Sequence, residues 1–75
     1  MTKEDFQEIF YAFDWKETPF QHKDILRFYH RDNKAQVYFP GGSVIFTDKN
    51  GNPQTYREIG RQTLVNKLKE FTYGK

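Results

Sequence analysis

The chain has 75 residues and no cysteine, and its 12 Lys and Arg against 10 Asp and Glu give a net charge of +2. We expect one domain over residues 1–75, because this length accommodates a single hydrophobic core, and the missing thiols exclude disulfides and thiolate metal sites. No apolar run approaches the roughly 20 residues that cross a bilayer, and there is no signal-peptide core. We therefore expect a cytoplasmic protein without a membrane partner.

The first segment has the pattern of an amphipathic helix. Thr2 is a suitable cap, because its hydroxyl can accept a backbone N–H that has no partner within the helix. One apolar stripe follows at the spacing i, i+3, i+4, i+7: Phe6, Ile9, Phe10 and Phe13. This predicts a helix from about Thr2 to Asp14. Residues 15–24 fit two alternatives, a helical turn that starts at Thr18-Pro19 or an irregular loop that packs Trp15 and Phe20 on the core.

The stretch 25–47 has the composition of three short antiparallel strands. β-branched and aromatic residues lie between turn-forming residues, which predicts strands over Leu26–His30, Ala35–Phe39 and Val44–Thr47. Two-residue turns at Asp32-Asn33 and Gly41-Gly42 then pair His30 with Ala35 and Phe39 with Val44.

Alternation along these strands divides the side chains between two faces. One face is almost entirely apolar: Leu26, Phe28, His30, Ala35, Val37, Phe39, Val44 and Phe46. The other is basic, aromatic and polar: Arg27, Tyr29, Arg31, Lys34, Gln36, Tyr38, Ser43, Ile45 and Thr47. A register error of one residue would mix the two sets.

The last segment predicts a second helix from about Thr55 to Thr72. Thr55 and Glu58 match a capping box, and Gly74 is suited to a helix C-terminus. The turn-rich residues 48–53 before it do not match a calcium loop, because the glycine arrives too early and Ile59 stands where a bidentate Glu belongs.

These elements predict an α+β fold of the order α-β-β-β-α. It is a three-stranded antiparallel meander with two helices packed on one face, which buries the apolar face and leaves the polar face in water.

The polar face, which the helices leave in water, is the leading candidate for a binding site, through Arg27, Tyr29, Arg31, Lys34 and Tyr38. Aromatic rings stack on bases and guanidinium groups pair with phosphates, so this mixture is typical of nucleic-acid binding. Tyr and Arg are also enriched at protein interfaces, so a protein partner, a homodimer or an ordinary solvated face are alternatives. Arg57 and Arg61, four residues apart on the predicted second helix, could extend a basic surface or simply be solvated.

The element order is similar to that of two families. Double-stranded RNA-binding domains share it, but the positions of their lysine cluster read Asn52-Pro53-Gln54-Thr55-Tyr56-Arg57 here. Small messenger-RNA-cleaving toxins also share it, but they rely on a glycine-flanked histidine, whereas His30 lies between Tyr29 and Arg31. Both resemblances are limited to topology, so no family is assigned.

We therefore predict a non-catalytic binding module that needs no cofactor or metal. Nucleic acid is the first candidate partner. The alternative is a protein-binding inhibitor or adaptor of the phage-like kind that mobile elements encode, acting through the same face or a sheet edge. A small ribonuclease centred on His30 is a minor alternative.

Overall fold

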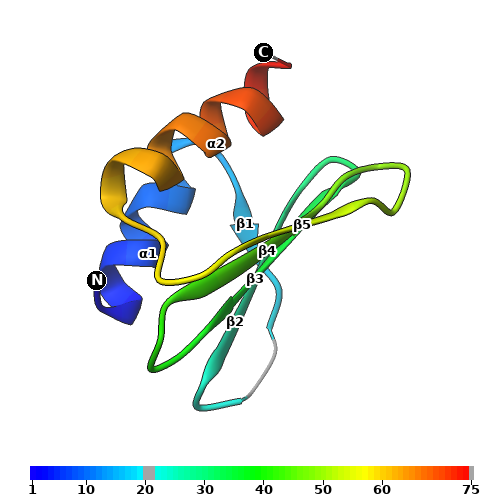
Figure 1. Cartoon of the computed structure of the whole chain (residues 1–75). Helices are drawn as coiled ribbons and strands as arrows, with labels where there is room; N and C mark the ends of the chain where they lie inside the picture. Colours follow the sequence, from blue (N-terminus) through cyan, green and yellow to red (C-terminus); the bar gives the residue numbers. More distant parts are fainter. Residues whose placement is uncertain (20–21, 75) are drawn as a thin grey trace.

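The computed structural model describes residues 1–19 and 22–74 and contains two helices and a five-stranded antiparallel sheet. The elements are α1 (Lys3–Ala12), β1 (Lys16–Glu17), β2 (Ile25–His30), β3 (Asn33–Tyr38), β4 (Ser43–Thr47), β5 (Pro53–Tyr56) and α2 (Arg61–Tyr73). The strands are hydrogen-bonded in the order β1-β2-β3-β4-β5. Both helices lie on the same side of this sheet (Figure 1), so the predicted α+β class and the predicted one-sided helix packing are confirmed.

Helix α1 forms where the sequence predicts it. The Thr2 side chain accepts a hydrogen bond from the Asp5 backbone N–H, and the Asp5 carboxylate accepts one from the Thr2 backbone, which completes a capping box. The predicted stripe faces the core, with Phe6 and Phe10 almost fully buried. The helix ends earlier than predicted, because Asp14 adopts a left-handed conformation with φ +65°.

The prediction of three strands is incomplete, because β1 and β5 extend the meander at its two edges. Strand β1 pairs Lys16 with Tyr29, and β5 pairs Thr55 with Ile45. A two-residue strand such as β1 is too short to show an alternating pattern. Of the two alternatives for residues 15–24, Trp15 does pack on the core, whereas Phe20 and Gln21 lie outside the described residues.

The predicted pairing within the meander is displaced by two residues. His30 pairs with Asn33 instead of Ala35, and Val44 pairs with Val37 instead of Phe39. The first turn is therefore Arg31-Asp32, and Asn33 is the first residue of β3. The Asn33 side-chain amide donates to the Phe71 carbonyl of α2 at 3.1 Å, which holds Asn33 in this position.

The second turn is longer than predicted because Phe39 leaves the sheet. Its ring packs edge-on against Phe6 of α1, with centroids 5.5 Å apart. Gly42 closes the loop with φ +73°, and its N–H donates to Tyr38. A displacement of two residues preserves the alternation, so the division of β2, β3 and β4 into an apolar face and a polar face is confirmed.

Helix α2 begins six residues later than predicted, at Arg61 instead of Thr55. Thr55 and Tyr56 belong to β5 instead, because β-branched and aromatic side chains suit a strand and the edge of β4 offers backbone partners. The capping box of Thr55 and Glu58 is therefore wrong, and Gly60 is the N-cap without a side-chain hydrogen bond. The predicted C-terminal role of Gly74 is confirmed by its φ of +76° and its N–H bond to Glu70.

The core lies between the two helices and the sheet. Helix α1 contributes Phe10, which stacks on Phe28 with ring centroids 4.1 Å apart. Helix α2 contributes Phe71, which stacks on Phe46 with ring centroids 4.8 Å apart. The Trp15 indole N–H donates to the Thr72 hydroxyl at 2.8 Å, so its polar atom is satisfied. Neither described helix is long and apolar enough to cross a membrane.

The β4–β5 connection is organised by one carboxylate. Asp48 accepts hydrogen bonds from the backbone N–H groups of Asn50 (2.8 Å) and Asn52 (3.0 Å), and Gly51 supplies the positive φ that the turn requires. The carboxylate that a calcium loop would need is therefore engaged by the chain's own donors. The Asn52 backbone bond is the main reason that the pKa of Asp48 lies below its ordinary value.

This lowered pKa predicts a pH dependence of stability. A depressed pKa in the folded state contributes stability above the unfolded value, about 3.9, and this contribution is lost as the pH falls through the folded pKa. Asp48→Asn keeps an acceptor oxygen but removes the charge. We expect it to unfold at lower urea concentration than the parent protein at neutral pH, with the difference vanishing in acid. A difference that is independent of pH would show that the charge of Asp48 does not stabilise the turn.

Candidate functional site

On the described strands, the face of the sheet opposite the helices carries no acidic side chain. The observed register places these residues on it: Lys16 of β1, Ile25, Arg27 and Tyr29 of β2, Lys34, Gln36 and Tyr38 of β3, Ser43, Ile45 and Thr47 of β4, and Pro53 and Thr55 of β5. We call this surface the open face. It is therefore basic and aromatic, whereas the charge of the whole chain is nearly balanced.

Tyr29 lies at the centre of a cross of four cationic residues. Its direct neighbours on the adjacent strands are Lys16 and Lys34, so each lies roughly 5 Å away between Cβ atoms. Arg27 and Arg31 lie two residues away along the chain, which corresponds to about 7 Å. Arg31 belongs to the turn after β2, where its φ is +56°. We call this arrangement the cation cross.

Tyr29 differs from the other four tyrosines in having no side-chain partner among the described residues. Tyr11 donates to Glu17, Tyr38 to Gln36 and Tyr56 to Gln54. Tyr73 packs against the ring of Phe13. The side chain of Tyr29 has no hydrogen bond and no ring contact with any residue of 1–19 or 22–74, and it is 40% exposed. An unpartnered aromatic ring in a cationic surrounding is available to a ligand.

The open face is hollowed around this cross. A concavity of about 500 Å³ is lined by Thr18, Arg27, Phe28, Tyr29, Arg31, Lys34, Ala35, Gln36, Ile45 and Thr47. Within this lining, the side-chain oxygen of Gln36 accepts from Arg27 Nε at 3.2 Å and from the Tyr38 hydroxyl at 3.3 Å. The amide nitrogen of Gln36 therefore remains as a donor. Donors dominate this hollow, which suits ligands rich in acceptor oxygens.

The five residues predicted on the open face do not contribute equally. Arg27, Tyr29 and Lys34 lie there as predicted, and Arg31 reaches the same hollow from the turn. Tyr38 also lies on this face, but it is half-buried, bonded to Gln36 and outside the lining of the hollow. The aromatic contribution to the site thus comes from Tyr29.

Arg57 and Arg61 are not arranged as predicted. They do not share a helix, since Arg57 follows β5 and Arg61 is the first residue of α2. Helix α2 packs on the side of the sheet that the two helices cover, which we call the covered side. The pKa of Asp5 in α1 is lowered mainly by the backbone hydrogen bond from Thr2, and the nearby charge of Arg61 contributes to this lowering. Neither arginine lines the hollow at the cation cross.

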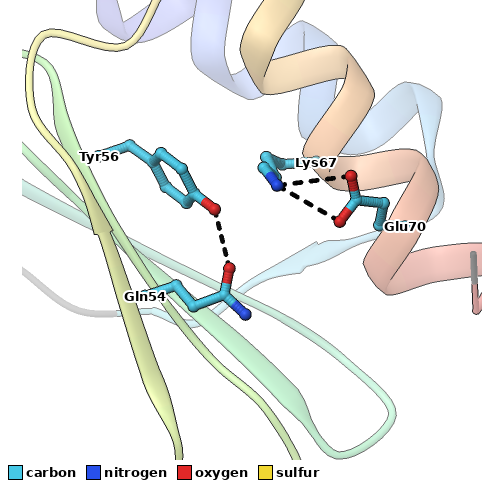
Figure 2. A network of polar contacts seen from close by, with 4 residues as sticks. All are labelled: Gln54, Tyr56, Lys67 and Glu70. Atoms are coloured by element: carbon cyan, nitrogen blue, oxygen red, sulfur yellow. Dashed lines mark hydrogen bonds and ion pairs between the residues drawn. The ribbon is translucent and has the colours of Figure 1, made fainter.

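A second polar cluster lies on the covered side, and its side chains bind one another (Figure 2). The Tyr56 hydroxyl donates to Gln54 at 2.8 Å, and Lys67 bonds both carboxylate oxygens of Glu70 at 3.4 Å. Lys67 also lies over the Tyr56 ring, 5.4 Å from its centroid. The interaction with Tyr56, followed by Glu70, raises the pKa of Lys67. This cluster joins α2 to β5.

Sequence reasoning missed Lys16, because it lies on a strand of two residues. The neighbouring Glu17 points to the helix side, where it accepts from Gln7 at 3.1 Å and from the Tyr11 hydroxyl at 2.6 Å. These bonds hold β1 against α1 and raise the pKa of Tyr11, mainly through the hydrogen bond to the carboxylate. Lys16 is thereby directed to the open face. Gln36 was placed on that face, but its hydrogen bonds to Arg27 and Tyr38 are contacts that a sequence does not show.

His30 lies on the covered side of β2, stacked on Trp15 with centroids 5.8 Å apart. Its Nδ1 is buried and has no hydrogen-bond partner among the described residues. The part of the chain that the structure describes contains no group of three metal-ligating side chains. No family model, curated protein or solved structure matches this chain.

Proposed function

We propose that the protein binds single-stranded nucleic acid through the open face. The observation that carries this proposal is the ring of Tyr29, which has no hydrogen bond or ring contact with a described residue and lies within a cross of four cations, on a face whose described strands carry no acidic side chain. A base stacked on an aromatic side chain contributes about 1–3 kcal/mol, and lysine and arginine gain affinity by displacing the counterions of phosphates.

The shape of the site favours a single strand over a duplex. A duplex keeps its bases stacked on each other, so a ring on a sheet surface cannot reach them, whereas unpaired bases can be splayed out onto it. The donors around the hollow, including the Gln36 amide and the Arg27 guanidinium, complement phosphate and base oxygens. The concave face can therefore accept the base and its phosphates together.

Binding to a protein through a sheet edge has less support. Strand β1 offers only two residues at one edge, and β5 at the other edge begins with Pro53, which has no N–H. Self-association through the open face would bring two cation crosses together, and like charges at short distance repel. These features favour a polyanionic partner over a second strand or a second copy.

The salt dependence of binding tests the proposal. We expect a labelled oligothymidylate of about 12 nucleotides to bind with an affinity that falls steeply from about 50 to 200 mM salt. Four neutralised phosphates correspond to a slope of roughly −2.8 in log K against log salt. Lys34→Gln should reduce this slope by about 0.7 in magnitude. The measurement is fluorescence anisotropy at several salt concentrations.

The matched control is Lys69→Gln, which removes the same charge from an exposed position on α2. It should leave both the affinity and the slope unchanged. An affinity that does not respond to salt, or equal effects of the two substitutions, would contradict binding at the open face. A labelled RNA in the same titration also tests the ribonuclease alternative, since cleavage that disappears in His30→Ala would assign a catalytic role to His30.

A further inference from the structure

A second hollow adjoins the first at the end of β2. Its volume is about 280 Å³, and it is lined by Asp14, Lys16, Tyr29, His30 and Arg31. Tyr29 and Arg31 line both hollows, so the two adjoin at these residues. A chain of nucleotides on the open face would therefore pass directly from the first hollow to the second.

The second hollow is framed by two residues in left-handed conformations. Asp14 has φ +65° and Arg31 has φ +56°, and continuing the β1–β2 pairing beyond Lys16 and Tyr29 places these two residues opposite each other. Non-glycine residues rarely adopt this conformation, and such residues gather at functional sites more often than elsewhere. The pairing of β1 and β2 ends at Asp14 and Arg31, and the hollow lies at this end of the two strands.

The polar groups of this hollow are not used by the protein itself. The Asp14 carboxylate forms no ion pair or hydrogen bond with a described residue, although Lys16 and Arg31 line the same hollow. The side chains of Lys16 and Arg31 likewise have no such partner among the described residues. The site thus presents one carboxylate as an acceptor and two cations as donors, beside an unpartnered aromatic ring.

We infer that this second hollow is a guanine subsite, an inference that rests on the proposed function. A carboxylate accepts two adjacent N–H groups at once, and guanine is the base that offers such a pair, at N1 and N2. The acceptors O6 and N7 of guanine are the usual partners of Arg and Lys. On the edge that pairs in a duplex, adenine, cytosine and thymine each have only one donor group, and it lies beside an acceptor. The carboxylate of Asp14 therefore selects guanine, and the Tyr29 ring stacks on it.

The test compares oligothymidylate of about 12 nucleotides with the same strand carrying one central guanine. We expect the guanine to tighten binding about tenfold, in the range of one bidentate base contact. Inosine at the same position, which lacks the N2 amino group, should lose most of this gain. Asp14→Asn should abolish the guanine preference and leave binding of plain oligothymidylate equal or slightly tighter, because a negative charge is removed near the phosphates.

Asn tolerates a positive φ, so Asp14→Asn keeps the local backbone. Asp32→Asn, in the exposed turn and outside the lining of this hollow, is the matched control and should retain the preference. Equal affinity for the plain and the guanine-containing strand would overturn the guanine subsite and leave the proposed function standing. Absence of binding to every strand would overturn both.

Discussion

Replacing Tyr29 by threonine is expected to weaken binding of single-stranded nucleic acid by about 5- to 150-fold, the equivalent of about 1–3 kcal/mol for one stacked base. Threonine is a good strand former without a ring, so the substitution removes the stacking surface and keeps the local β preference. Tyr29 is 40% exposed and has no hydrogen bond or ring contact with a described residue, so the melting temperature should change little. Titration of the labelled oligothymidylate by anisotropy, beside a thermal melt, measures both quantities.

Two further variants locate the effect in the ring. Tyr29→Phe keeps the ring and should keep most of the affinity, which separates stacking from hydrogen bonding by the hydroxyl. Tyr73→Ala removes a tyrosine that is 67% exposed at the end of α2 and should bind as the parent protein does. Loss of stability in Tyr29→Thr would place the ring in the core and contradict the open face. Equal losses of affinity in the Tyr29 and Tyr73 variants would point to non-specific binding.

Replacing Phe46 by alanine is expected to destabilise the protein by about 3–5 kcal/mol, the usual cost of a buried aromatic ring. Phe46 is fully buried, and its ring packs against Phe71 at 4.8 Å and against Phe10, Trp15 and Tyr56 at 6.1–6.3 Å. A chain of this length has a total stability of roughly 4–11 kcal/mol. The variant should therefore unfold at a much lower urea concentration, or be partly unfolded in buffer.

Urea denaturation followed by circular dichroism gives the measurement. Phe46→Leu, which fills more of the same space, should cost clearly less than the alanine variant. Thr63→Ala, at an exposed position of α2, should stay within about 0.5 kcal/mol of the parent protein. A small effect of Phe46→Ala would mean that the layer between helices and sheet is not the source of stability.

The features that the sequence predicts well are those with redundant local signals. Helix α1 has a cap at Thr2, an acid at Asp5 and an apolar stripe that ends at Phe13, and these agree with one another. The two faces of the sheet follow from alternation alone, which survives a register displacement of two residues. This is why Arg27, Tyr29 and Lys34 could be placed on one surface before the pairing was known.

The features that could not be predicted depend on contacts between distant segments. Thr55 and Glu58 match a capping box locally, but the edge of β4 pairs with Thr55 as a strand, so tertiary pairing overrides the local signal. Asn33 is a typical turn residue, but its amide bonds the Phe71 carbonyl, which moves the turn to Arg31-Asp32. Lys16 lies beside Tyr29 because β1 pairs with β2 and because Glu17, on the other side of the strand, is bound by α1.

The position of Trp15 gives the protein a native fluorophore at a useful place. It is the sole tryptophan of the chain, and its indole stacks on His30, the residue directly after Tyr29. The indole N–H is held by Thr72 in the last turn of α2. Its emission therefore reports, without any attached dye, on the back of the ligand-facing strand and on the docking of the C-terminal helix in a single spectrum.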